Sequence, residues 1–199
     1  MLKVQRMRKI ASEIRTCVEC PLAEERKNAV PGEGTIGAKV VFVGEAPGYW
    51  EDINGAPFVG AAGKVLDGLL EWIGLARKHV FITNVVKCRP PENRDPKPME
   101  IAKCTSLYLD RQIGLIKPKI VVTLGRHSTA YILSKAGFEN VDSIAEFRGK
   151  VYSVGFYGLA FVVVPMYHPA SVLHNPRYRD ALESDFQLLK KELKKRRIV

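Results

Sequence analysis

The 199-residue sequence has no apolar run near the 18 or more residues that a membrane span needs. Charged residues occupy its N-terminus, where a signal peptide would place a hydrophobic stretch. It has no internal repeat and no low-complexity tract, and 46% of its residues are hydrophobic, which is enough for a sizeable core. We therefore expect a soluble, cytoplasmic protein without a membrane partner, folded as one domain over residues 1–199.

Two sequence motifs are also missing. Gly63-Lys64 is followed by Val65, so the Ser or Thr that binds magnesium in a Walker phosphate loop is absent, and we expect no nucleotide cofactor. The closely spaced three-cysteine run of ferredoxins is absent as well, which argues against a dedicated electron carrier.

The sequence contains four cysteines, a C-x2-C pair at Cys17 and Cys20 and two single residues at Cys88 and Cys104. Inside a cell, cysteines are more often metal ligands or free thiols than disulfides. Four thiolates suit a [4Fe–4S] cluster or a structural zinc ion. The spacing alone leaves three interpretations open: a cluster, zinc or unliganded thiols.

The net charge is +10, with 31 basic and 21 acidic residues. Residues 1–16 carry five basic residues and one acid, and residues 177–199 carry eight and four, so the two ends hold +8 of the +10. This surplus predicts a polyanionic partner, with nucleic acid ahead of a membrane surface. The alternative is that two terminal helices have solvated basic faces.

Short β-branched runs alternate with longer helical patterns, which is typical of an α/β fold with a mainly parallel sheet. The predicted strands are 39–43, 80–83, 120–124, 151–154 and 160–164. The last two are predicted to form a hairpin that turns at 156–158. Predicted helices include one that ends at Gly74, one that begins at Pro98 and one that runs from Gly125 to about Lys135. Two terminal helices have buried faces at Val4, Met7, Ala11 and Ile14 and at Leu182, Phe186, Leu189 and Leu193.

In open parallel sheets, ligands bind beyond the carboxyl ends of the strands. The segments that leave these ends are 44–48, Asn84, 125–126 and 167–169. We therefore expect a carboxylate, an amide and an imidazole to converge in one crevice although they are far apart in sequence.

Five short motifs occur in a characteristic order. They are GEAPG at 44–48 with Glu51-Asp52, PFVG at 57–60, Thr83-Asn84 before KCRP at 87–90, the four cysteines, and YHPAS at 167–171. Over nearly its whole length, the sequence resembles the family 4 uracil-DNA glycosylases, the iron–sulfur class of archaea and thermophilic bacteria. The resemblance implies a central four-stranded, mainly parallel sheet flanked by helices, and a structural [4Fe–4S] cluster on the four cysteines.

The resemblance further implies an enzyme that flips uracil out of DNA, hydrolyses its N-glycosidic bond and releases free uracil, leaving an abasic site. Phe58 matches the aromatic residue that stacks on the base, and Asn84 matches the amide that pairs with N3–H and O4 of uracil. His168 matches the histidine that hydrogen-bonds uracil O2 as negative charge develops there. The implied uracil-binding residues are Gly44, Glu45, Ala46, Glu51, Phe58, Asn84 and His168.

The first motif departs from that of the better-known uracil glycosylases, which read GQDP. Glu45 stands in the place of the Gln, and Ala46 stands in the place of the Asp that positions water. We take Glu45 and His168 as the catalytic pair. Our hypothesis is that Glu45 orients the attacking water or stabilises the sugar cation, and that Glu51 obstructs the methyl group of thymine.

Two segments are predicted to contact DNA, a glycine-rich helix start suited to phosphate and a loop that pushes into the duplex. Their candidate residues are Gly60, Gly63, Lys64, Ser171, Val172, Leu173 and Arg177. The leucine of the better-known enzymes aligns with Val172, one place before Leu173, so the sequence does not decide which of the two is the wedge.

Two further functions stay open: a non-catalytic iron–sulfur module that binds nucleic acid, and a relative that acts on other deaminated bases such as hypoxanthine. We expect a monomer. Whether a sliding clamp is a partner and whether single or double strands are preferred are not decided by the sequence.

Overall fold

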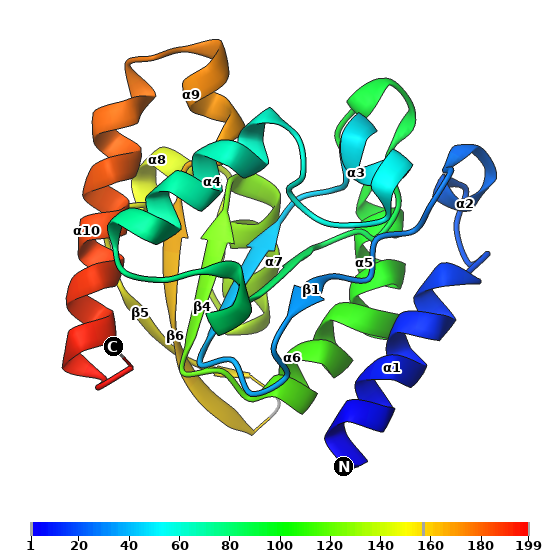
Figure 1. The fold of residues 1–199 in the computed structure, drawn as a ribbon, viewed down its shortest axis with the longest axis horizontal. Coiled ribbons are helices and arrows are strands. Elements are labelled where there is room, and N and C mark those ends of the chain that lie inside the picture. The colour runs from blue at the N-terminus through cyan, green and yellow to red at the C-terminus, as the bar shows by residue number, and fades with distance from the viewer. Residues whose placement is uncertain (1, 157, 199) are drawn as a thin grey trace.

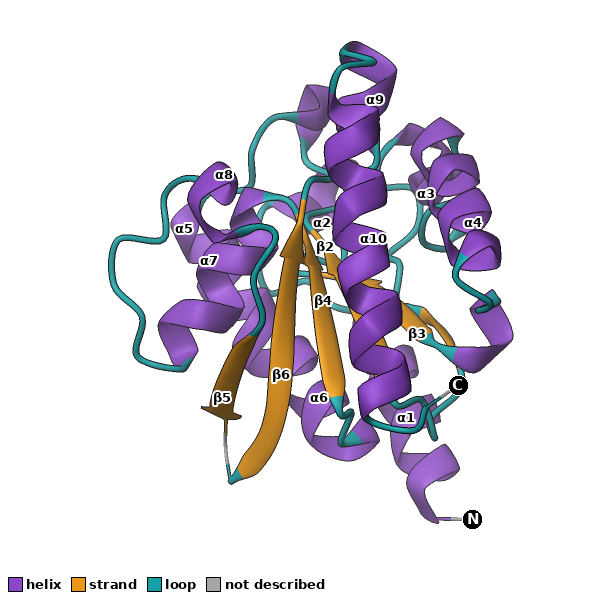
Figure 2. Ribbon diagram, turned by 90° about the vertical axis from the view of Figure 1, so that its left-hand side faces the viewer, coloured by secondary structure: helices purple, strands orange, loops and turns teal. Residues whose placement is uncertain are grey.

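The computed structural model describes residues 2–156 and 158–198 and contains a six-stranded sheet with helices on both faces (Figures 1 and 2). The strand order is β1-β3-β2-β4-β6-β5. The strands are β1 Glu33–Gly34, β2 Val40–Gly44, β3 Phe81–Asn84, β4 Ile120–Leu124, β5 Tyr152–Phe156 and β6 Leu159–Met166.

The prediction of four strands is wrong, because two antiparallel edge strands are added to the expected parallel core. Strands β3, β2, β4 and β6 are parallel to one another, whereas β1 pairs antiparallel with β3, and β5 pairs antiparallel with β6. Strand β1 has only two residues, both exposed, so it has no apolar alternation to reveal it. The hairpin is confirmed, although Tyr157 of its predicted turn lies outside the described residues.

The longer helices agree with the predicted ones to within a few residues, and short helical segments lie between them. The helices are α1 Leu2–Arg15, α2 Leu22–Glu25, α3 Tyr49–Asn54, α4 Ala61–Trp72, α5 Pro98–Cys104, α6 Asp110–Ile116, α7 Arg126–Lys135, α8 Ile144–Phe147, α9 Ala170–His174 and α10 Tyr178–Lys195. A π-helical turn, Thr105–Leu109, joins α5 to α6 directly after Cys104. No helix in the described part of the chain is both long enough and apolar enough to cross a membrane.

Each face of the sheet has its own core because side chains alternate along a strand. Phe42 and Val122 pack with α4 and α10, whereas Val41 and Val121 pack with α1, α6 and α7. The buried face of α10 is the predicted one. In α1, Ile10 is buried and Val4 is exposed, since the helix contacts its neighbours along one side only.

The carboxyl ends of the four parallel strands lie at one edge of the sheet, together with α3 and α9 (Figure 1). Both termini lie in the lower half of that view, towards the opposite edge. Lys195 and Arg196 line a hollow with Lys119, which immediately precedes β4. The basic end of α10 is therefore near the amino ends of the strands.

Candidate active site

A cavity of about 450 Å³ lies where β2, β3 and β6 end. Its lining includes seven of the predicted uracil- or DNA-binding residues, namely Glu45, Ala46, Glu51, Phe58, Asn84, His168 and Ser171. Sequence reasoning missed other lining residues, among them Asn93, Arg94 and His174. The expected convergence of a carboxylate, an amide and an imidazole is confirmed.

Gly44 leaves room for the side chains of Asn84 and Phe58. It pairs in register with Asn84 on the adjacent strand. A Cβ atom at position 44 would lie 2.8 Å from Phe58 Cζ and even closer to Asn84 Oδ1. Any larger residue would therefore displace the amide, the ring or both.

Asn84 is buried, and its Oδ1 has no hydrogen-bond partner among the described residues. A buried acceptor without a donor costs about 1–3 kcal/mol, so such atoms usually have a partner. Since Asn84 lines the cavity, a ligand that carries an N–H group would satisfy this oxygen.

Phe58 is buried with a left-handed backbone, at φ 53°. Arg77 holds this conformation: it donates to the carbonyl of Pro57 at 3.0 Å and to that of Phe58, and it pairs with Asp67 at 2.6 Å. Strain of this kind is common at functional sites. Sequence reasoning missed Arg77 because nothing in its local pattern indicates a contact about twenty residues away.

The ring of His168 is stacked near that of Phe58, with centroids 5.5 Å apart and planes 29° from parallel. The backbone N–H of Ala170 donates to His168 Nδ1 at 3.2 Å, so the proton of the neutral ring is on Nε2. Burial lowers the pKa of His168 to about 4, against the opposite influence of Glu51. At neutral pH the site therefore holds an uncharged imidazole that can donate one hydrogen bond.

Glu45 follows β2 and is half-buried, and burial raises the pKa of its carboxyl group. His127 Nε2 lies 3.8 Å from Glu45 Oε2 and 3.5 Å from Asp95 Oδ2, and Arg126 donates to the same Asp95 oxygen at 2.6 Å. His127 and Arg126 act against this rise in pKa, and Asp95 adds to it. His127, to which no sequence motif assigns a role, forms part of the electrostatic surroundings of Glu45.

Glu51 is bonded to backbone groups on two sides of a loop. Its Oε1 accepts hydrogen bonds from the N–H groups of Val59 at 2.8 Å and Gly60 at 2.9 Å, and its Oε2 accepts from Gly48 at 3.1 Å. These bonds fix Glu51 in the cavity wall and join the start of α3 to the start of α4.

Gly60 and Gly63, which are predicted to contact phosphate, both make close contacts within the chain. The Gly60 N–H already donates to Glu51. Gly63 is buried, and a Cβ atom there would overlap the carbonyl of Phe58. Both glycines therefore have a packing role, Lys64 beside them is exposed, and the DNA contacts of all three stay predictions.

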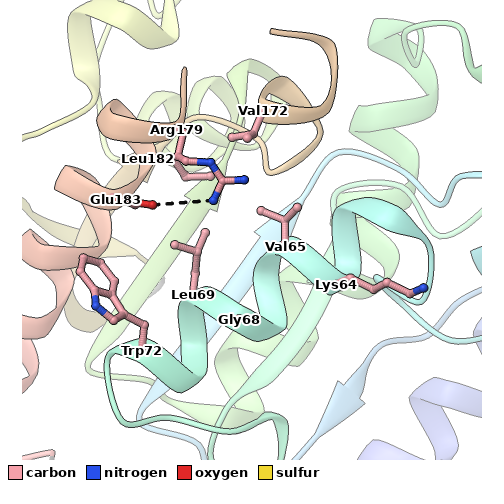
Figure 3. Close-up of a pocket in the computed structure, with 9 residues that line it drawn as sticks. All are labelled: Lys64, Val65, Gly68, Leu69, Trp72, Val172, Arg179, Leu182 and Glu183. Carbon is pink, nitrogen blue, oxygen red and sulfur yellow. Dashed lines mark ion pairs between the residues drawn. The ribbon is translucent and has the colours of Figure 1, made fainter. Parts of the chain in front are cut away.

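The two candidates for the wedge, Val172 and Leu173, differ in their exposure to solvent. Val172 in α9 is only 6% exposed, and its side chain faces a hollow between α4 and α10 that Val65, Leu69 and Trp72 also line (Figure 3). Insertion of Val172 into a duplex would require it to leave this packing, and its contact with DNA stays a prediction. Leu173 is 48% exposed, beside Ser171 of the cavity, and Arg177 is exposed.

The four cysteines converge around one small hollow that Ile14, Leu107 and Tyr108 also line. Cys17 and Cys20 lie in the loop after α1, Cys88 lies in the loop after β3, and Cys104 ends α5. All four are free, with no disulfide between them. Positions far apart in sequence thus form a tetrad of thiols around one hollow, which fits a four-thiolate cluster.

Positive groups surround this tetrad. Arg26 donates to Cys88 Sγ at 2.9 Å and to the carbonyl of Cys17 at 2.6 Å, and the backbone N–H of Lys87 bonds to the Cys104 sulfur. Burial raises the pKa of the Cys104 thiol to about 12. A bound cation would offset this effect and hold the sulfurs as thiolates.

Comparison with known proteins supplies the family. The model of the Uracil DNA glycosylase superfamily matches residues 31–194. The chain belongs to this superfamily. Similar relatives of this glycosylase include three named Type-4 uracil-DNA glycosylase.

The relative from Sulfurisphaera tokodaii is 56% identical over 92% of this chain and 83% of its own. The one from Saccharolobus solfataricus is 54% identical over 92% of this chain and 85% of its own. The one from Archaeoglobus fulgidus is 49% identical over 89% of this chain and 88% of its own.

Proposed function

We propose that this glycosylase removes uracil from DNA, as the names of its relatives state for them, and that the cavity at the strand ends holds the flipped base. The observation that carries the proposal is the buried, unpartnered Asn84 Oδ1 beside the stacked rings of Phe58 and His168. Uracil offers N3–H to this acceptor and a flat face to the Phe58 ring.

The leaving base needs stabilisation because the N-glycosidic bond breaks with both electrons going to uracil. His168 Nε2–H donates to uracil O2 while this charge develops, and its low pKa keeps it a neutral donor rather than an acid. Water supplies hydroxide to C1′ of the sugar, and its second proton goes to the Glu45 carboxylate. The uracil anion takes up a proton after it leaves, and the products are uracil and an abasic site.

Ala46 carries no carboxylate, so Glu45, which lines the cavity, is the proposed acceptor of this proton. Glu51 remains the proposed obstruction to the thymine methyl group, since three backbone bonds fix it in the cavity wall. Leu173 is the proposed wedge, because it is exposed next to the cavity.

The four cysteines are the proposed ligands of a [4Fe–4S] cluster, and the convergence of Cys17, Cys20, Cys88 and Cys104 on one hollow supports this. When bound, the cluster would tie the segment after α1 and the loop after β3 to α5. Hydrolysis of the N-glycosidic bond needs no electrons from it. A brown colour with broad visible absorption would distinguish it from zinc.

We further propose that the glycosylase acts as a single-domain monomer in the cytoplasm, and a sliding-clamp contact stays open.

The decisive experiment incubates the protein with an oligonucleotide that contains one uracil and cleaves abasic sites with alkali. We expect cleavage at uracil and none at thymine or hypoxanthine. His168→Ala should slow single-turnover excision by about 10²–10³-fold, because it removes a donor to the developing charge. DNA binding without cleavage would contradict the proposal and support a non-catalytic module, and cleavage at hypoxanthine would support the altered base choice.

A further inference from the structure

Two aromatic side chains begin helix α3, directly after Gly48 of the uracil cavity. Tyr49 is 48% exposed and Trp50 is 58% exposed, and their rings meet edge to face with centroids 5.2 Å apart. The flanking residues Gly48 and Glu51 both line the cavity. A large exposed aromatic surface therefore continues from the cavity wall.

The surroundings of this pair hold it in place. Trp50 packs against Gly60, where an added Cβ atom would lie 3.4 Å from Trp50 Cδ1. The Asn54 side chain donates to the carbonyl of Trp50 at 2.7 Å. The guanidinium carbon of Arg89 lies 5.2 Å from the centroid of the Tyr49 ring.

Arg89 also connects the aromatic pair to the cavity. Its Nε donates to Asn93 Oδ1 at 2.8 Å, and Asn93 lines the cavity. The loop after β3 thus contributes a cation to the same surface to which α3 contributes two rings. Aromatic rings beside an arginine form the type of surface on which unpaired nucleobases stack.

We propose that Trp50 and Tyr49, with Arg89, form a stacking subsite for a nucleobase that neighbours the uracil in the same strand. The inference rests on the proposed uracil cavity. A base that leaves the stack exposes a face of its neighbour, and the subsite covers that face with a ring. Nucleic acid fits this surface better than a protein partner, because the strand must pass the cavity entrance for uracil to enter.

The test is a chemical double-mutant cycle on single-stranded oligonucleotides that contain one uracil. One substrate is intact, and in two others a tetrahydrofuran spacer replaces the base on the 5′ or the 3′ side. The protein variants are the wild type, Trp50→Ala and Trp72→Ala. Trp72 is the matched control, because it is the other tryptophan of the chain, is 44% exposed and lines the separate hollow behind α4.

We expect one of the two spacers to weaken binding to the wild type by about tenfold, the value of one stacked base. Trp50→Ala should weaken binding of the intact substrate by a similar factor, and the spacer should then weaken it no further. Trp72→Ala should behave as the wild type does. In a Trp72→Phe background, Trp50 fluorescence should be quenched by the intact substrate and less by the substrate with that spacer.

If Trp50→Ala weakens binding by the same factor with the intact substrate and with both spacer substrates, the effects of variant and spacer are independent, and the subsite is overturned. Unchanged binding of Trp50→Ala would do the same. The alkali assay keeps the two proposals apart. If the wild type excises uracil at saturating substrate but the effects of Trp50→Ala and of the spacer on binding are independent, only the stacking subsite is rejected. If the wild type excises no uracil, the proposed uracil cavity is rejected.

Discussion

The Lys87 ammonium donates to the backbone carbonyl of Asn84 at 2.7 Å, and this bond joins the cysteine tetrad to a residue of the cavity lining. Lys87 also donates to Thr83 Oγ1 at 2.7 Å and is only 1% exposed. It precedes Cys88 in sequence, and its backbone N–H bonds to the Cys104 sulfur. One residue of the loop after β3 therefore contacts both sites.

Lys87→Met should destabilise the fold by about 1–3 kcal/mol, because it leaves two buried oxygens without their donor. It should also slow uracil excision, since the end of β3 that carries Asn84 loses its support. Denaturant unfolding and single-turnover kinetics measure the two effects. Lys103→Met is the control, because Lys103 lines the same hollow but is exposed, and a loss of stability as large as that of Lys87→Met would contradict the argument.

Gly44→Ala should reduce excision by about 10²-fold, the usual cost of displacing a binding group by about 1 Å. The new methyl group would overlap Asn84 Oδ1 and the Phe58 ring. Gly68→Ala is the control, because a Cβ atom there meets nothing within 4 Å and lies inside α4. It should keep full activity and raise stability by about 0.5–1 kcal/mol. Equal activity of the two variants would show that Gly44 is not needed for the site.

The pKa of His168 should be about 4 in the folded protein when followed by the chemical shift of its ring proton in NMR. Its ordinary value is 6.5, so between about pH 4 and 6.5 the unfolded chain binds a proton that the native ring does not. Stability should therefore rise with pH across this window. His168→Gln should flatten the rise, and a ring that titrates near 6.5 in the native state would contradict the neutral donor.

The fall of the excision rate at low pH should reflect protonation of Glu45. Burial raises the pKa of that carboxyl group, whereas His168 stays neutral until about pH 4. Glu45→Gln should lower the single-turnover rate and remove this fall. If the variant keeps the full rate at neutral pH, Glu45 does not orient the water.

Leu173→Ala should slow excision from double-stranded DNA by about tenfold or more and leave single-stranded excision little changed, since unstacking a duplex costs a few kcal/mol per step. Val172→Ala should instead lower stability, because Val172 is buried against α4. Parallel melting curves and excision rates distinguish them, and the reverse pattern would make Val172 the wedge.

The salt dependence of DNA binding should come from basic residues near the carboxyl ends of the parallel strands rather than from those at the two chain termini. Lys64→Gln and Arg177→Gln should each reduce the slope of log affinity against log salt by about 0.9, the value for one phosphate contact. Neutralising Lys190, Lys191, Lys194 and Lys195 together should leave that slope nearly unchanged, because the basic end of α10 lies near the amino ends of the strands. A large change in the slope would restore the basic terminal helices as DNA contacts.

Much of the fold was predictable because local patterns record burial within each element. The β-branched runs marked the parallel strands, and the apolar spacing of Leu182, Phe186 and Leu189 marked the buried face of α10. The polar strand β1 left no such record, since two exposed residues pair with β3 through backbone groups alone.

The sequence by itself determined the family motifs, the succession of the parallel strands and longer helices along the chain, and the residue types that meet at the cavity. These features depend on local periodicity and on short motifs. Only the tertiary structure decided which neighbour of a motif faces solvent and which faces the core, as at Leu173 and Val172. It also brought Arg77 to the Phe58 carbonyl and His127 to Glu45. These contacts join segments that are distant in the chain, and packing between elements, which no local pattern encodes, creates them.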